Sequence, residues 1–177
     1  VFTLALIVLL AAGALYWCCR HVMHSSGRSI ETEMPLLPCE PTVLHARIVF
    51  AGDLMQHMPQ LTAARTPDGF DFNASFDWVR ERFRSADVAV VNLETTLSES
   101  GPYTGYPCFR SPAVLAEALD SLGVDIAVLA NNHCCDGGQK GIRTTIQELD
   151  RHGIDYTGVF LDSLDFRTRH PLRFEAN

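Results

Sequence analysis

The chain has 177 residues, which is enough for one ordinary domain with a hydrophobic core. Its formal net charge is −7, with 14 Lys and Arg residues against 21 Asp and Glu residues. Surfaces that bind nucleic acid are normally basic, so this charge argues against a nucleic-acid partner.

Residues 1–19 contain no charged side chain. Their length is close to the roughly 20 apolar residues that a membrane-spanning helix needs. Tyr16 and Trp17 stand near one end, as interfacial aromatic residues do. A cleaved signal peptide is the alternative, but no small-residue cleavage site follows closely and the apolar run is long for a signal core. We therefore expect an uncleaved transmembrane helix and a single-pass membrane protein.

Residues 20–46 are expected to be a linker, because they contain a Ser-Ser-Gly sequence and three spaced prolines. The domain is then expected to occupy residues 47–177. Its last residues, 171–177, resemble the beginning of a strand, so we expect the domain to be truncated here and to continue in a longer protein.

Strands and helices are predicted to alternate through this domain. Short apolar runs predict strands at 47–53, 87–94, 124–131 and 154–160. Helical periodicity predicts helices at 73–86, 111–123 and 139–153. In the second helix, Ser111 suits the N-cap, Pro112 the first helical position and Gly123 the C-terminal stop. This alternation indicates the α/β class with a largely parallel sheet.

Polar side chains gather where the predicted strands end. They are Asp53, His57, Asn92, Glu94, Asn132, His133 and Asp136. Ligands of open α/β sheets bind outside the carboxyl ends of the strands, so these side chains are expected to converge. Carboxylates, amide oxygens and imidazoles suit divalent ions such as Mn, Fe or Zn, and the pattern therefore favours a metal site.

Each of these residues also has an ordinary alternative role. Asp53 could cap a turn, Glu94 could be a solvated charge, and His133 could be a surface or core histidine. The alternatives are less convincing together, because all the residues fall at one edge of the predicted sheet. Cys134 and Cys135 are adjacent, a spacing that makes a strained disulfide and poor tetrahedral zinc ligands. They are therefore not expected to form a redox or zinc element.

Four motifs, in this order and spacing, resemble the CapA family of bacterial capsule and poly-γ-glutamate biosynthesis proteins, which are related to calcineurin-like metallophosphoesterases. They are FAGDLMQH (50–57), VNLETTLS (91–98), YPCFRSP (106–112) and LANNHCCDGGQKGIRTTIQEL (129–149). The resemblance implies a layered α/β/β/α metallophosphatase-like fold, of which this chain would hold the N-terminal part. It also implies further histidine motifs after residue 177.

The resemblance further implies a site with one or two divalent metal ions. The implied metal ligands are Asp53, His57, Glu94 and Asn132, and the implied catalytic residue is His133. The motif of the wider metallophosphoesterase superfamily has a histidine where this chain has Met55, and His57 is the candidate replacement. Asn92, Asp136 and Arg110 are expected to support these ligands or to contact the substrate.

Two functions remain open at this stage. The first is a membrane-anchored, metal-dependent hydrolase that serves capsule or poly-γ-glutamate synthesis and acts on a phosphoester or an anionic polymer. The second is a non-catalytic accessory module that guides the polymer within a membrane synthesis complex. In both, the expected location is the bacterial cell membrane, with the domain outside the cytoplasm and other polymer-synthesis proteins as partners.

Overall fold

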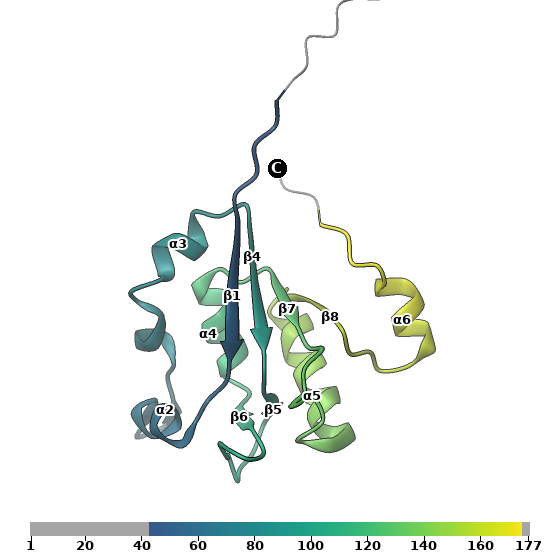
Figure 1. Ribbon diagram of the computed structural model, residues 1–177. Coiled ribbons are helices and arrows are strands. Elements are labelled where there is room, and N and C mark those ends of the chain that lie inside the picture. Colours follow the sequence, from purple (N-terminus) through teal and green to yellow (C-terminus); the bar gives the residue numbers. More distant parts are fainter. Residues whose placement is uncertain (1–42, 175–177) are drawn as a thin grey trace, which may run out of the picture. The chain divides into compact units, whose positions relative to one another are not determined.

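The computed structural model describes residues 43–174, and from Leu44 onward they form one compact unit (Figure 1). The strands are β1 (Ile48–Leu54), β2 (Arg65–Thr66), β3 (Gly69–Phe70), β4 (Val88–Leu93), β5 (Thr96–Ser98), β6 (Arg110–Pro112), β7 (Ile126–Val128) and β8 (Asp155–Thr157). The helices are α2 (Met58–Ala63), the 3-10 helix η1 (Asn73–Phe76), α3 (Arg80–Arg84), α4 (Leu115–Leu122), α5 (Gly138–Arg151) and α6 (Ser163–Arg169).

The central sheet has four parallel strands in the order β1-β4-β7-β8 (Figure 1). These are the four strands that the apolar runs predicted, so the α/β class with a parallel sheet is confirmed. β4 is almost wholly buried, as its apolar run Val88–Val91 indicated, because an interior parallel strand is shielded on both faces. Two short pairs accompany this sheet, antiparallel β2-β3 and parallel β5-β6.

The pairing of β1 with β4 contains a β-bulge near its carboxyl end. Ala51 pairs with Val91. The next pair is Asp53 with Asn92, which leaves Gly52 without a partner. Because paired residues in neighbouring strands point to the same face, the extra residue turns Asp53 to the face that carries Asn92. An unbroken register would have turned this carboxylate to the opposite face.

The main hydrophobic core joins one face of the sheet to helices α4 and α5. The leucines of α4 that the sequence predicted to be buried, Leu115, Leu119 and Leu122, are all buried, and so is Ile146 of α5. α4 ends at Gly123, whose φ of 96° is a left-handed conformation that glycine adopts without steric cost. The predicted helix boundaries at this end of α4 are therefore confirmed.

The opposite face of the sheet carries a smaller apolar cluster. It consists of Val88, Val90 and Ile126, with Leu172 packed against them. Phe50 pairs with Val90 and so shares this face, yet 75% of its surface is exposed. Near β1, the described residues therefore leave an apolar part of a parallel sheet uncovered.

The predicted helix at 73–86 forms two short helices, η1 and α3. Between them the chain turns outward, and Trp78 is 97% exposed. The guanidinium of Arg80 donates to the carbonyl of Asn73 at 2.9 Å and to the carbonyl of Ser121 at 3.0 Å. The carbonyl of Asn73, which would accept a backbone N–H in a continuous helix, is thus bonded to Arg80. The second bond of Arg80 connects residues 73–86 to α4.

The predicted helix at 111–123 begins later than expected, at α4. Ser111 and Pro112 belong to β6, which pairs with β5. The hydroxyls of Ser111 and Thr95 are 3.0 Å apart, so Ser111 is used in this pairing and not as a helix cap. The tertiary contact has overridden the local capping signal.

The C-terminal part also differs from the prediction. Residues 171–174 form no strand, and the rest of the predicted strand lies outside the described residues. Helix α6 was not predicted, although Asp162 caps it by accepting two backbone hydrogen bonds. The hydroxyl of Tyr156 donates to Asp165 of α6 at 3.2 Å, and Arg169 lies over the Tyr156 ring. These contacts attach α6 to β8.

The predicted single-pass membrane location is corrected by the structure. No helix within residues 43–174 is long and apolar enough to cross a membrane. The longest of them, α5, has 14 residues. At about 1.5 Å per residue it is shorter than the roughly 30 Å hydrocarbon core of a bilayer. The predicted transmembrane helix at 1–19 and most of the predicted linker at 20–46 lie outside the described residues.

Candidate functional site

Asn92, at the end of β4, joins two carboxylates at the carboxyl edge of the sheet. Its side-chain Nδ2 donates to Oδ1 of Asp53 at 2.9 Å and to Oε2 of Glu94 at 2.8 Å. Asp53 reaches Asn92 through the β-bulge, and the backbone N–H of Glu94 donates to Leu54 at 2.9 Å. Glu94 is buried, whereas Asp53 is exposed. The structure thus brings three of the predicted residues together.

Asn131 extends this group, although the sequence analysis did not select it. Its Nδ2 donates to Oδ1 of Asn92 and to the carbonyl of Leu93, both at 3.0 Å. Its Oδ1 accepts the backbone N–H of His133 at 3.1 Å. Asn131 therefore connects the end of β4 to the loop that follows β7. The available signal was the doubled asparagine, because a strand-end amide can donate and accept at once.

His133 and Asp136 form a close pair in this loop. Nδ1 of His133 is 2.7 Å from Oδ2 of Asp136, and the side chains are 15% and 14% exposed. The backbone N–H of Phe109 donates to the same Asp136 oxygen at 2.6 Å. When Nδ1 carries the proton, the pair holds the imidazole in one orientation and leaves Nε2 to accept or donate a proton. None of the described residues hydrogen-bonds Nε2.

The ring of Phe109 lies between two imidazoles. Its centroid is 4.8 Å from that of His57 and 4.7 Å from that of His133, and both contacts are edge-to-face. A side chain on Gly105 would come within 3.0 Å of the backbone N of Met58, so glycine allows this loop to approach His57 closely. Phe109 was not selected from the sequence, because its role depends on a loop that returns from β5 to β6.

The other predicted residues lie apart from the carboxylates. His57 packs against Phe109 and makes no hydrogen bond to Asp53 or Glu94. Asn132 is exposed, and no side-chain hydrogen bond from it to the described residues occurs. Arg110 is half-buried and donates to the hydroxyl of Ser98 at 3.0 Å. The structure therefore joins Asp53, Asn92 and Glu94 in one group, and pairs His133 with Asp136 beside it.

The donor chemistry fits a divalent cation only in part. Carboxylate and amide oxygens are ligands that hard cations prefer, and Asn92 holds Asp53 and Glu94 close to one another. However, no three His, Cys, Asp or Glu side chains within residues 43–174 lie close enough together to hold a metal ion. The described part of the chain could therefore supply one side of a metal site but does not enclose an ion.

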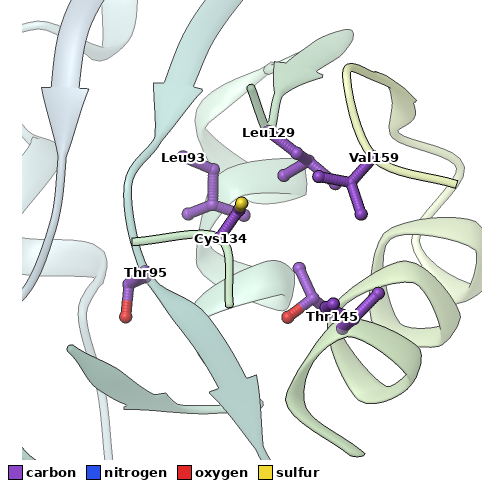
Figure 2. A pocket seen from close by; sticks show the side chains of 7 residues that line it. Leu93, Thr95, Leu129, Cys134, Thr145 and Val159 are labelled. Atoms are coloured by element: carbon purple, nitrogen blue, oxygen red, sulfur yellow. The ribbon is translucent and has the colours of Figure 1, made fainter. Parts of the chain in front are cut away.

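The two cysteines of this loop lie in different environments. Cys134 faces a small pocket with Leu93 and Leu129, and Figure 2 shows its sulfur among these side chains. Burial raises the pKa of the Cys134 thiol above its ordinary value. Cys135 is exposed, and the two sulfurs are 3.7 Å apart, without a disulfide. Cys134 therefore has the environment of a small apolar side chain.

Comparison with known proteins agrees with the motifs. The family model for bacterial capsule synthesis protein PGA_cap matches residues 47–172. The chain is 34% identical over 85 residues to a probable polyglutamine synthesis accessory protein in each of two Mycobacterium tuberculosis strains, which covers 47% of this chain and 22% of each relative. It is 32% identical over 91 residues to an uncharacterized protein of Sinorhizobium fredii, which covers 48% of this chain and 20% of that relative.

The chain thus spans about a fifth of the length of these relatives. The family match, by contrast, takes in most of the chain and all four motifs that resembled the CapA family. The chain therefore belongs to the bacterial capsule synthesis protein PGA_cap family.

Proposed function

We propose that the protein acts in the synthesis of an acidic capsule polymer of the polyglutamate class, and that the carboxyl edge of its sheet contributes to a hydrolytic site. The family match and the polyglutamine synthesis accessory relatives support the first part. The observation that carries the second part is the His133–Asp136 pair, which is held at 2.7 Å beside two carboxylates.

In this proposal His133 transfers a proton through Nε2. Asp136 holds the ring by Nδ1, and its negative charge stabilises the imidazolium that forms when Nε2 is protonated. Nε2 then donates that proton to the leaving group of the bond that breaks. A proton donor assists the departure of an amine from an amide and of an alcohol from a phosphoester, so the pair is consistent with either substrate. Phe109 keeps the ring in place by packing on it and by binding Asp136 through its N–H.

Asp53 and Glu94 are proposed to hold a divalent cation, Mn, Fe or Zn, together with donors from outside the described residues. The Nδ2 group of Asn92 donates to both carboxylates, so a cation that binds both would take the place of this donor. When bound, a cation would supply positive charge that activates water and stabilises a developing oxyanion. Asn132 and His57 stay candidate ligands, and reaching the carboxylates would require their side chains to reorient.

The test uses the full-length protein, with γ-linked polyglutamate and a phosphoester as parallel substrates. We expect His133→Ala to lower turnover of one substrate by about 10²–10⁴-fold, the usual contribution of a positioned acid or base. His45→Ala, which alters an exposed histidine in a different part of the chain, is the matched control and should keep full turnover. Equal turnover by His133→Ala and the unaltered protein would exclude the proton-transfer role.

A metal measurement on the same protein tests the carboxylates separately. We expect purified full-length protein to contain a divalent metal, and Asp53→Asn and Glu94→Gln to contain less of it. An exposed carboxylate on α4, Glu117, supplies the control variant Glu117→Gln. If all the proteins contain equal amounts of metal, the proposed roles of Asp53 and Glu94 are wrong.

The second candidate is a non-catalytic accessory module that guides the polymer among other synthesis proteins. Two observations favour it: Met55 stands where the motif of the wider metallophosphoesterase superfamily has a histidine, and residues 43–174 contain no cluster of three metal-binding side chains. This candidate predicts polymer binding without turnover of either substrate. Binding that accompanies hydrolysis would decide for the enzyme.

The layered α/β/β/α arrangement is part of the proposal. Helices α4 and α5 cover one face of the sheet, while the other face is partly exposed at Phe50. Parallel sheets are normally covered on both faces. The uncovered apolar face supports a second layer, contributed by parts of the longer protein.

A further inference from the structure

Arg110, the first residue of β6, carries a charge that the described residues do not neutralise. Its side chain is half-buried and makes one hydrogen bond, from Nη2 to the hydroxyl of Ser98 at 3.0 Å. Nε is shielded from solvent and has no hydrogen-bond partner within residues 43–174. None of the ion pairs in this part of the chain includes Arg110.

The other partly buried arginines within residues 43–174 have carboxylate partners. Arg80 lies 3.3 Å from Asp77, and Arg169 lies 3.0 Å from Asp165. A shielded N–H without an acceptor and a half-buried charge without a counterion both cost free energy. Arg110 is thus an exception that packing alone does not explain.

The backbone holds Arg110 from both sides. Its partner in β5 is Thr96, and on its other side the N–H and carbonyl of Thr104 pair with the carbonyl and N–H of Arg110 at 3.0 and 2.9 Å. In this register Arg110 shares a face with Ser98, opposite to the buried Leu97. The main chain at Arg110 is therefore fixed, and binding an anion would require little ordering of it.

Arg110 directly follows a residue that contacts the candidate site. The preceding residue, Phe109, donates its N–H to Asp136 and packs on His133. Side chains of consecutive residues in an extended chain point to opposite faces, so a ligand of several units is needed to reach from Arg110 to His133. A fixed guanidinium matches a carboxylate by two parallel N–H donors, a geometry that lysine cannot reproduce.

We propose that Arg110 is a substrate-binding residue that pairs with a carboxylate of the polymer on which the protein acts. This inference rests on the proposed function, because γ-linked polyglutamate carries one free carboxylate on each unit. Arg110 would hold one unit by its carboxylate while another linkage of the same polymer lies near His133. The role is binding and positioning, and Arg110 takes no part in the proton transfer.

The test measures binding and not turnover, so that it stays informative if the hydrolytic proposal fails. Full-length protein carrying His133→Ala is titrated calorimetrically with a γ-linked glutamate oligomer and, separately, with inorganic phosphate. Arg110→Gln and Arg110→Lys are compared with Arg143→Gln, which removes the same charge from an exposed position on α5. The oligomer arm tests a carboxylate ligand, and the phosphate arm tests a phosphate ligand.

We expect Arg110→Gln to weaken oligomer binding at least about tenfold, the loss of one charge-assisted contact. Arg110→Lys should bind with intermediate strength, because it keeps the charge and loses the two-donor geometry. Arg143→Gln should bind like the parent. Oligomer binding that is unchanged in Arg110→Gln, or weakened equally in Arg143→Gln, would overturn the proposal. Weakened phosphate binding with unchanged oligomer binding would overturn the assignment to a polymer carboxylate.

A measurement without substitution covers the case in which Arg110→Gln does not fold. Arginine side chains of the unaltered protein are modified with phenylglyoxal, and the modified positions are located by peptide mass analysis. We expect the γ-linked oligomer to protect Arg110 and to leave Arg143 equally reactive. Modification of Arg110 at the same rate with and without the oligomer would contradict the proposal.

Discussion

Asp136 is expected to contribute to the stability of the fold as well as to the site. One of its oxygens accepts from His133 Nδ1 at 2.7 Å and from the backbone N–H of Phe109 at 2.6 Å. Hydrogen bonds to charged groups contribute about 1.5–3 kcal/mol each. Asp136→Ala removes both bonds and leaves the N–H of a residue that is 2% exposed without an acceptor. We therefore expect the free energy of unfolding to fall by about 3–5 kcal/mol.

A second variant, Asp136→Asn, removes the charge of Asp136 and keeps the size and shape of its side chain. Its carbonyl oxygen can occupy the same position and accept the same two donors, so we expect a smaller loss of about 1–2 kcal/mol. The assay is urea unfolding followed by circular dichroism, with unchanged slopes as the check that the unfolded states are alike. Glu117→Ala, at an exposed position on α4, should change the free energy of unfolding by less than about 0.5 kcal/mol. An Asp136→Ala variant as stable as Glu117→Ala would refute this reasoning.

Three further predictions concern the elements around the site. Gly158→Ala should destabilise the protein by about 2–4 kcal/mol, because the new Cβ would lie 2.6 Å from the backbone N of Ala130 and φ is +96°. Gly153→Ala, with φ of +68° and open space around it, should lower the stability by only about 1–2 kcal/mol. Equal losses of stability in the two variants, measured by thermal unfolding, would contradict the predicted clash at Gly158. Backbone hydrogen bonds to Asp162, which caps α6, hold its pKa below the ordinary 3.8. The stabilising effect of the Asp162 carboxylate should therefore be present above that pH and be lost as the pH falls below it. In acid, the hydrogen-exchange rates of α6 should become alike in Asp162→Ala and in the unaltered protein. A difference in these rates that persists in acid would exclude this cause. Tyr156→Phe should lower the free energy of unfolding in urea by about 0.5–1.5 kcal/mol through its lost hydroxyl bond, and no change would mean that water replaces the bond.

Hydrophobic patterning predicted the sheet because burial depends on side-chain chemistry that is visible in the sequence. The run Val88–Val91 is apolar throughout and lies in the interior strand β4. The spacing of the α4 leucines and the glycine that follows them likewise predicted the buried face and the end of that helix. Local residue preferences predicted the structure less well where a distant segment bonded to the same polar groups. Serine is a residue type that often caps helices, but Ser111 pairs with β5 as part of β6.

The candidate site shows the same division. Strand-end positions predicted that Asp53, Asn92 and Glu94 would meet, and the structure joins them through the Asn92 amide. Sequence position could not show that Asn131, and not the adjacent Asn132, bonds to Asn92. Neighbouring residues in a turn point in different directions, and the backbone dihedrals that decide between them depend on the packing of the whole loop.

The sequence by itself determined the class of the fold, the family and the edge of the sheet at which polar side chains gather, because apolar runs and motif spacing are properties of the chain alone. Only the tertiary structure decided which of those side chains touch. A single unpaired residue, Gly52, turns Asp53 toward Asn92, and a loop from β5 to β6 delivers Phe109 to Asp136. Register and loop return depend on contacts between segments that are distant in the sequence, and local residue patterns do not encode such contacts.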